Sequence, residues 1–367
     1  MDKDQVCQAS EEERREIVER YNKGQDEGSC KGVDPNDIID EYGFIHKGPT
    51  PQMSKNSKAA KHRLESQAKT SKWMQMINQW EKHANGSEMA SLIYKGIPNN
   101  LRGKVYRRLL GIDKLKQDHE FVYQEKLSQA LESSPHIPQI DVDLNRTYRN
   151  NVAFRERYSF AQKSVFFALA AYSIHNPQVG YCQGMSEIAA VLFMYLYDEE
   201  DVFWALTVLI SDSKFGMHGY FIPKFPKLKV AQAHHDRIVR KFLPKVHDNL
   251  NRNGITPNLY TTRWFLKCLL DSVPFHLAVR LWDIWMLEGE KLLIAMMYNM
   301  VKMYRHQLVK INLDRMMTLM QTSLPKDFGY SDDEVIKSLQ TCMQELEKAK
   351  LSMHSPPQVW EVLTKYY

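Results

Sequence analysis

The stretch FAQKSVFFALAAYSIHNPQVGYCQGMSEIAAVLFMYL, Phe160 to Leu196, contains two long apolar segments separated by a short loop. In the first segment, apolar side chains recur every three or four residues and predict one buried helix face: Val165, Phe166, Leu169 and Tyr172. The second segment, Ile188–Tyr195, is apolar on nearly every side, which is typical of a helix at the centre of a core. The stretch therefore predicts two adjacent core helices.

Helical periodicity continues on both sides of this stretch. In KGIPNNLRGKVYRRLLG, Pro98 lies near a predicted helix start and Gly111 lies just past its end. Further helices are expected over Glu120–Leu131, Asp201–Ile210, Ala231–Asn249, Leu259–Leu270, Phe275–Met286, Lys291–His306 and Asp332–Lys350. No sustained alternation typical of strands is present, and no Asn-Gly or Asp-Gly pair joins two such runs. The sequence predicts an all-α fold with short loops.

The first 70 residues form a charged accessory segment by composition. Within it, Glu11–Lys23 is predicted to be a polar helix. A second helix is expected in Lys55–Lys82, because its apolar residues recur on one face and should pack on the main domain: Trp73, Ile77 and Trp80.

The composition limits the class of protein. A chain of 367 residues is long for one core and indicates one large domain with additions, or two domains. A formal net charge of +5 is too small to argue for nucleic acid, although a basic face could meet an acidic partner or an anionic membrane. The charged N-terminus predicts no signal peptide. The longest apolar run, Ile188–Tyr197, is shorter than the ~20 residues that span a bilayer.

Several kinds of chemistry have no motif in the sequence. The five cysteines are scattered without a CxxC pair, which favours reduced thiols over a disulfide framework or zinc site: Cys7, Cys30, Cys182, Cys268 and Cys342. Cys182 has no identifiable base and is interpreted as a small apolar filler. Side chains of adjacent helical residues diverge by about 100°, so His234 and His235 are expected to be a helix-surface pair and no metal site. Phosphate-binding loops of the GxxxxGK[ST] type, kinase motifs, HExxH and GxSxG do not occur.

Three predicted loops are the places where chemistry is expected: Pro138–Arg149, Asn176–Gly184 and Ser213–Lys227. The third mixes glycine, proline and aromatic residues, and is either an ordered surface loop or a partner-contacting one.

The first loop carries a charge pair. If it begins with a helical turn, Ile140, Asp143 and Arg146 or Thr147 lie on neighbouring faces. Asp143 could then orient the Arg146 guanidinium through a charge-assisted hydrogen bond. Taken alone, this arginine is most simply a structural ion pair.

The second loop presents an aromatic ring and an amide on a tight turn. Asn176-Pro177 ends the preceding helix, and Gly180 and Gly184 bracket the sequence Tyr181-Cys182-Gln183. On its own, this feature also has no specific functional meaning.

Together the two loops resemble a known signature. IDVDLNR has the form IxxDxxR, YCQ has the form YxQ, and Arg102 begins the upstream motif RGKVY. In this order and spacing they resemble the TBC domain family, the GTPase-activating proteins for Rab GTPases. The resemblance covers about Gly96 to Glu290, and it includes the block from Phe154 to Leu196 quoted in part above.

Further phrases extend the resemblance. Trp264-Phe265 and RLWDIWMLEGE, which contains Trp282, Asp283 and Gly289, resemble the C-terminal half of the family. KWMQMINQWEK, IYKGIP and FPKL resemble the branch of RN-Tre and the Tre oncogene. One motif departs from the family: its usual RxxxW pattern has Tyr106 in place of tryptophan. We expect this tyrosine to pack inside the domain, provided that its hydroxyl finds a partner.

The resemblance implies a role for each motif residue. Arg146 matches the arginine finger and Gln183 the glutamine finger, the two residues that act on the GTP of a Rab protein. It further implies that Asp143 orients Arg146, that Tyr181 shapes the second loop, and that Ile140 is buried beneath the first. Thr147 is expected to support the first loop. The structural positions of the family motifs are Arg102, Tyr106, Gly184, Trp264, Trp282 and Asp283.

The resemblance also implies an organisation and a cellular setting. It predicts two helical subdomains in residues 96–290, preceded by a leading helix in 71–95 and followed by packing helices in 291–350 and a tail in 351–367. The implied partner is a GTP-bound Rab protein that brings its own Mg²⁺ and GTP, so no cofactor, metal or nucleic acid is expected. The implied location is cytoplasmic, with transient attachment to endosomal or Golgi membranes. Two alternatives stay open: a TBC-fold module that binds a GTPase or scaffolds proteins without accelerating hydrolysis, and a helical scaffold unrelated to GTPases.

Overall fold

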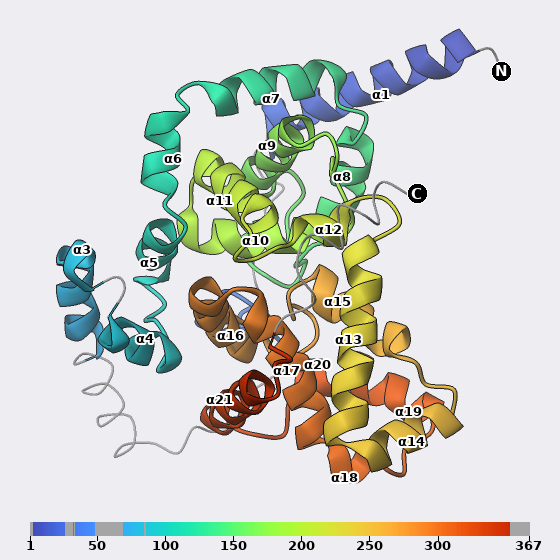
Figure 1. Cartoon of the computed structure of the whole chain (residues 1–367). Helices are drawn as coiled ribbons and strands as arrows, with labels where there is room; N and C mark the ends of the chain where they lie inside the picture. Colours follow the sequence, from blue (N-terminus) through green and yellow to red (C-terminus); the bar gives the residue numbers. More distant parts are fainter. Residues whose placement is uncertain (1–2, 26–31, 33, 48–68, 84–85, 353–367) are drawn as a thin grey trace. The chain divides into compact units, whose positions relative to one another are not determined.

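The computed structural model describes residues 3–25, 32, 34–47, 69–83 and 86–352. Within these residues almost every element is a helix (Figure 1), and the strands are confined to one short hairpin. The all-α prediction is therefore confirmed. The chain divides into two compact units, the first formed by residues 1–84 and 98–208 and the second by residues 85–97 and 209–367.

The first unit contains the N-terminal elements and the helices up to the middle of the chain. Its elements are α1 (Lys3–Lys23), β1 (Ile38–Ile39), β2 (Ile45–His46), α3 (Trp80–His83), α5 (Arg102–Leu109), α6 (Ile112–Asp118), α7 (Val122–Ser133), α8 (Ile137–Leu144), α9 (Phe160–His175), α10 (Met185–Leu196) and most of α11 (Glu199–Ser211).

Helices α9 and α10 form the centre of the first unit, and α9 packs against α7, α8 and α10. The prediction of a single buried face on α9 is wrong, because the helix is buried all round: every residue from 161 to 173 is buried except Lys163. Ser159 begins this helix by accepting a hydrogen bond from the backbone of Gln162. Helix α5 approaches α10 closely at Gly103, where a Cβ atom would lie 2.0 Å from the carbonyl oxygen of Tyr195. Only glycine permits that approach.

Two motif residues of α5 are buried against α10. The guanidinium of Arg102 lies 5.0 Å from the centre of the Tyr195 ring and donates to the side chain of Asn99 at 2.7 Å. Tyr106 is fully buried and meets the Tyr195 ring edge-on at 6.0 Å. The ring of Tyr106 is thus packed inside the first unit, as expected.

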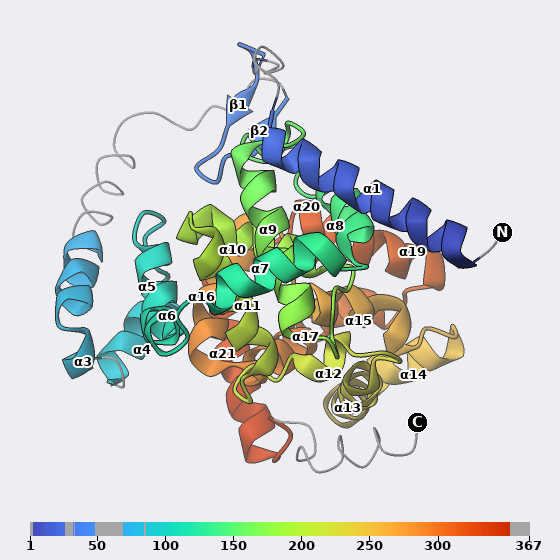
Figure 2. The ribbon, with the colours of Figure 1, turned by 90° about the horizontal axis from the view of Figure 1, so that it is seen from above.

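The N-terminal segment departs from the sequence-based expectation in two ways. The predicted polar helix is present as α1, but Ile17 and Tyr21 are buried, and α1 lies alongside α8 and α9 (Figure 2). An antiparallel hairpin, β1–β2, follows it although no strand was expected. The Asp40 carboxylate forms its turn by accepting from the amides of Tyr42 and Phe44, both at 2.9 Å.

The apolar face expected around Trp73 lies in a helical stretch over residues 69–78. Trp73, Met76 and Trp80 are buried, whereas Ile77 is only half-buried, so Met76 takes the position expected for Ile77. The rest of that predicted helix, residues 55–68, lies outside the described residues.

The second unit contains one early helix and the C-terminal helices. Its elements are α4 (Ser87–Tyr94), α12 (His218–Phe221), α13 (Pro226–Phe242), α14 (Pro244–Arg252), α15 (Pro257–Leu266), α16 (Phe275–Glu288), α17 (Glu290–Met303), α18 (Arg305–Leu308), α19 (Leu313–Thr318), a π-helical turn (Leu319–Ser323), α20 (Leu324–Lys326) and α21 (Asp332–Lys348). The single helix expected over Ala231–Asn249 is wrong, since Pro244 ends α13 and starts α14.

The tryptophan motifs build the core of the second unit. Trp264 and Trp282 are buried, and the indole of Trp282 donates to the carbonyl of Cys268 at 2.9 Å. Asp283 is fully buried and accepts from the backbone amide of Ile97 at 2.9 Å. This carboxylate therefore fastens the segment after α4 onto α16.

Candidate functional site

The loop that carries Arg146 extends helix α8 by one further turn. Pro138 occupies the first turn of α8, where its missing amide costs no hydrogen bond. After Leu144 the backbone keeps turning, with the amides of Arg146 and Thr147 donating to the carbonyls of Asp143 and Leu144 at 3.1 and 3.2 Å. We call residues 145–150 the arginine loop.

Asp143 is the centre of the site. Its side chain is 1% exposed, and three side chains donate to it: Arg146 Nη2 at 2.5 Å and Gln139 Nε2 at 3.0 Å on Oδ1, and the Tyr181 hydroxyl at 2.7 Å on Oδ2. Arg146 itself is 54% exposed, so its guanidinium is held at one nitrogen and open to solvent elsewhere. Gln139 was not singled out from the sequence, although its position one helical turn before Asp143 could have indicated the contact.

The loop that carries Gln183, residues 176–184, has a backbone that requires glycine at two positions. Gly180 has φ of +57°, and a Cβ atom there would lie 2.3 Å from the His136 ring. Gly184 has φ of +105° and directly precedes α10. The amide side chain of Gln183 is exposed, and within the described residues it makes no hydrogen bond. We call residues 176–184 the glutamine loop.

Each loop is held by a contact to a neighbouring helix, the glutamine loop to α8 and the arginine loop to α10. The buried Tyr181 hydroxyl donates to Asp143, and burial followed by this carboxylate raises the pKa of Tyr181 well above its ordinary value, so the hydroxyl keeps its proton. The Thr147 hydroxyl donates to the carbonyl of Asp143 at 2.8 Å and lies 3.1 Å from the hydroxyl of Ser186, in the first turn of α10. Ile140 is fully buried beneath them. The arginine and the glutamine thus stand on loops that share one buried carboxylate.

Other groups singled out from the sequence have different surroundings. Burial, followed by the Asp143 charge, raises the pKa of the Cys182 thiol, which disfavours the thiolate that a nucleophile needs. The histidine pair is buried, so the prediction of a surface pair is wrong. His234 contacts the carbonyl of Leu351 at 2.9 Å and His235 the hydroxyl of Tyr260 at 3.1 Å. Among the residues that the structure describes, no cluster of three or more His, Cys, Asp or Glu side chains could hold a metal ion.

The third predicted loop, Ser213–Lys227, contains the short helix α12 and ends at a buried ion pair. Lys227 Nζ lies 2.7 Å from the carboxylate of Glu290, which also accepts from the hydroxyl of Tyr220 at 3.1 Å. Burial lowers the pKa of Lys227. The loop is therefore anchored from inside the second unit.

Comparison with known proteins identifies the family. The model of the Rab-GTPase-TBC domain matches residues 99–309, which is more than half of the chain. This chain belongs to the Rab-GTPase-TBC domain family. Proteins of this family act as GTPase activators for Rab proteins, and the match contains both the arginine loop and the glutamine loop.

The relatives of this TBC protein include two from frogs. Growth hormone-regulated TBC protein 1 of Xenopus laevis is 29% identical over 281 residues, which cover 76% of this chain and 81% of the relative. The protein of the same name from Xenopus tropicalis is 29% identical over 279 residues, covering 76% and 80%.

Two solved structures share the fold of this TBC protein. The flagellar RabGAP TBC domain of Chlamydomonas superposes with a TM-score of 0.64 at 21% identity, covering 82% of this chain and 98% of that domain. The Ypt/Rab-GAP domain of Gyp1p superposes with a TM-score of 0.62 at 16% identity, covering 75% and 99%. Within the described residues, this TBC protein has no helix long and apolar enough to cross a membrane.

Proposed function

We propose that this TBC protein accelerates GTP hydrolysis by a Rab-family GTPase and that Arg146 and Gln183 act on the bound nucleotide of the partner. The observation that carries the proposal is the shared carboxylate. Asp143 accepts a hydrogen bond from Arg146 at 2.5 Å. It also accepts one from the Tyr181 hydroxyl at 2.7 Å, which holds the loop that carries Gln183. A structural ion pair would explain the first contact, but it gives no reason for the exposed amide on a second, glycine-dependent loop.

Arg146 would stabilise the charge that builds on the phosphoryl oxygens in the transition state. One nitrogen of its guanidinium is bound to Asp143, and the others are available to a phosphate. An arginine supplied in trans raises the hydrolysis rate of GTPases by ~10³–10⁵. Because the guanidinium is already held at one nitrogen, less conformational freedom remains to be lost when it binds.

Gln183 would position the water that attacks the γ-phosphate. Its amide has both a donor and an acceptor, so it can orient a water molecule and contact the partner at the same time. In this scheme it takes the place of the glutamine that a GTPase normally uses for the same purpose. Mg²⁺ and GTP arrive with the partner.

The setting follows from the same resemblance. We infer a cytoplasmic protein that meets GTP-bound Rab proteins at endosomal or Golgi membranes and thereby regulates vesicle trafficking. Placement in the branch of RN-Tre and the Tre oncogene rests on three short phrases only. The frog relatives carry a different name, Growth hormone-regulated TBC protein 1.

The test is a GTP hydrolysis assay over a panel of Rab proteins. Arg146→Ala and Gln183→Ala should each abolish most of the acceleration. Arg149→Ala, an exposed arginine of the same loop, and Gln178→Ala, an exposed glutamine of the second loop, should not. Acceleration that survives in both finger variants would reject the mechanism. Nucleotide-dependent binding without any acceleration would instead identify a binding module.

Arg146→Lys tests the geometry of the guanidinium. Lysine keeps the positive charge but has a single nitrogen, which cannot bind Asp143 and a phosphate in the same planar arrangement. We expect at least a tenfold loss of kcat. Activity close to that of the wild type would mean that charge alone suffices.

A further inference from the structure

The hairpin β1–β2 pairs with the chain directly after the arginine loop. The amide of Ile45 donates to the carbonyl of Asn150 at 2.7 Å, and the amide of Val152 donates to the carbonyl of Gly43 at 2.9 Å. Phe44 and Asn151 form the bridge between these two bonds. The exit of the arginine loop is therefore attached to the N-terminal hairpin by an isolated bridge with a backbone hydrogen bond on each side.

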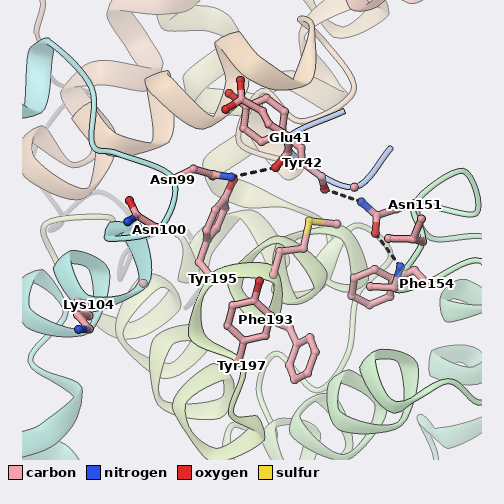
Figure 3. Close-up of a pocket in the computed structure, with 15 residues that line it drawn as sticks. Glu41, Tyr42, Asn99, Asn100, Lys104, Asn151, Phe154, Phe193, Tyr195 and Tyr197 are labelled. Carbon is pink, nitrogen blue, oxygen red and sulfur yellow. Dashed lines mark hydrogen bonds between the residues drawn. The ribbon is translucent and has the colours of Figure 1, made fainter. Parts of the chain in front are cut away.

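The side chain of Asn151 completes this attachment. It is 2% exposed, donates to the carbonyl of Tyr42 at 2.9 Å, and accepts from the amide of Ala153 at 3.0 Å. On the other side of the same turn, Asn99 donates to the carbonyl of Glu41 at 3.0 Å. Figure 3 shows the two amides reaching the hairpin turn from different parts of the chain.

A pocket of about 350 Å³ borders this turn, and the two asparagines line it together with residues 41–43. The pocket leaves the turn without close packing on that side. The hydrogen bonds from Asn99 and Asn151, with the backbone pairing, therefore decide where the turn lies.

The arginine loop needs such support. Tyr148, two residues after Arg146, has φ of +46°, a left-handed conformation that is unfavourable for a bulky side chain. A strained backbone conformation persists only where the surrounding contacts hold it in place. Phe44 of the hairpin meets the Tyr148 ring edge-on at 5.7 Å, so part of these surroundings comes from the N-terminal segment.

The helix before the loop is held by the same N-terminal segment. Arg157 pairs with the carboxylate of Asp141 on α8 and donates to its carbonyl at 3.2 Å. The Arg157 guanidinium also donates to the hydroxyl of Tyr21 at 3.4 Å. Tyr21, on α1, is fully buried and stacked on Phe166 at 3.8 Å. Helix α8 before the arginine loop is thus held through Tyr21 of α1, and the chain after the loop is held by the hairpin β1–β2.

We propose that the hairpin of residues 34–47 is a positioning element for Arg146, acting through Asn151 and Tyr148. The inference rests on the proposed GTPase activation for its effect on catalysis. Its mechanical part, that the hairpin holds the loop, stands on the contacts alone. Asn99 and Asn151 are positioning residues, because neither would touch the nucleotide.

The experiment uses the full chain with three matched asparagine-to-aspartate variants. Asn151→Asp keeps the acceptor for Ala153 and loses the donor to Tyr42. Asn99→Asp loses the donor to Glu41 and keeps the acceptor for Arg102, so it loosens the turn without touching the arginine loop. The control is Asn100→Asp, which adds the same charge beside Asn99 at an exposed position whose side chain makes no hydrogen bond within the described residues.

Two readouts separate positioning from general stability. With a responsive Rab protein, Asn151→Asp and Asn99→Asp should lower kcat three- to tenfold while KM stays within twofold, and Asn99→Asp should retain the melting temperature of the wild type. Hydrogen exchange of peptides covering residues 146–153 should quicken in both variants, since the amides of Asn151 and Val152 are bonded within this assembly. Asn100→Asp should change neither kcat nor the exchange of these peptides.

The failures are distinguishable. If the wild-type chain accelerates no GTPase, the proposed function fails, and the exchange measurement still decides whether the hairpin holds the loop. Unchanged exchange in Asn99→Asp overturns the inference. So does a wild-type kcat in Asn99→Asp and Asn151→Asp when the wild-type chain is active. Should Asn151→Asp fail to fold, Asn99→Asp alone carries the test.

Discussion

Replacing Asp143 by asparagine tests whether this carboxylate aims the arginine. The substitution keeps the shape of the side chain and removes its charge. If the amide oxygen takes the place of Oδ1, Arg146 and Gln139 keep an acceptor, at the present distances of 2.5 and 3.0 Å. The new NH₂ group then faces Tyr181, whose hydroxyl can turn and accept. The variant should therefore fold.

The size of the effect follows from the bond that loses its charge. The substitution replaces an ion pair by a hydrogen bond from the guanidinium to a neutral amide, so the contact keeps one charged partner. An ion pair with an exposed partner contributes about 0.2–1 kcal/mol, and Arg146 is 54% exposed. If this energy orients the guanidinium, a loss of up to about 1 kcal/mol corresponds to a fall in kcat of up to about fivefold.

The assay is a double-mutant cycle in GTP hydrolysis. Asp143→Asn is measured in the wild type and in Arg146→Ala, with Asp118→Asn as a control for the same change at an exposed position. If Asp143 acts through Arg146, Asp143→Asn should lower kcat in the wild type and leave it unchanged in Arg146→Ala. Thermal melting of each variant shows whether the fold is retained.

Two results would refute this reasoning. An unchanged kcat in Asp143→Asn would mean that the contact neutralises Arg146 without aiming it. An equal loss of kcat in both backgrounds would mean that Asp143 acts on the loops themselves, through Tyr181, and has no separate effect on the arginine.

Three further predictions concern the fold. Burial lowers the pKa of His235 to about 3, so the unfolded chain takes up the proton first and the free energy of unfolding falls as the pH drops below about 6.5. Between pH 7.5 and pH 5, the free energy of unfolding of His235→Gln, measured in urea, should fall by about 2 kcal/mol less than that of the wild type. Equal losses in the two proteins would contradict this. Lys227→Met leaves the Glu290 carboxylate buried without its cation and should lower the free energy of unfolding by about 3–5 kcal/mol. Adding Glu290→Gln to this variant should reduce the loss in the same urea assay. Gly180→Ala should cost about 1–2 kcal/mol because of its positive φ and the nearby His136 ring; a wild-type urea midpoint would show that the loop adapts freely.

Local patterns predicted most of the helices. The segments around α9 and α10 have their apolar residues and their glycine-marked loop within 40 residues of sequence, and such signals need no knowledge of the rest of the fold. The break at Pro244 was present in the sequence but was outweighed by the periodicity around it. The burial of His234 and His235 had no local signal, because their partners Leu351 and Tyr260 lie 117 and 25 residues away.

Some contacts of the candidate site could be predicted from the sequence, whereas the elements that hold its loops could not. The spacing of Asp143 and Arg146 on one turn indicated their contact, and the motif match indicated Gln183. The hairpin was invisible, because two strands of two residues each carry no period. Its attachment through Asn151 to Tyr42 spans 109 residues of sequence. Contacts of this kind depend on tertiary packing, which composition and periodicity do not describe.

The ion pair and the proposed catalytic role of Arg146 do not exclude each other. A carboxylate beside a catalytic cation lowers the net charge that the phosphate meets, which would be a disadvantage if the pair were closed on both sides. Here Asp143 is buried and takes a single guanidinium nitrogen, and the same carboxylate is shared with Gln139 and Tyr181. Its charge is thereby spread over three donors, and the solvent side of the guanidinium stays open. A buried, shared aspartate is the arrangement in which an arginine can be fixed in direction and still be available to an anion that arrives from outside.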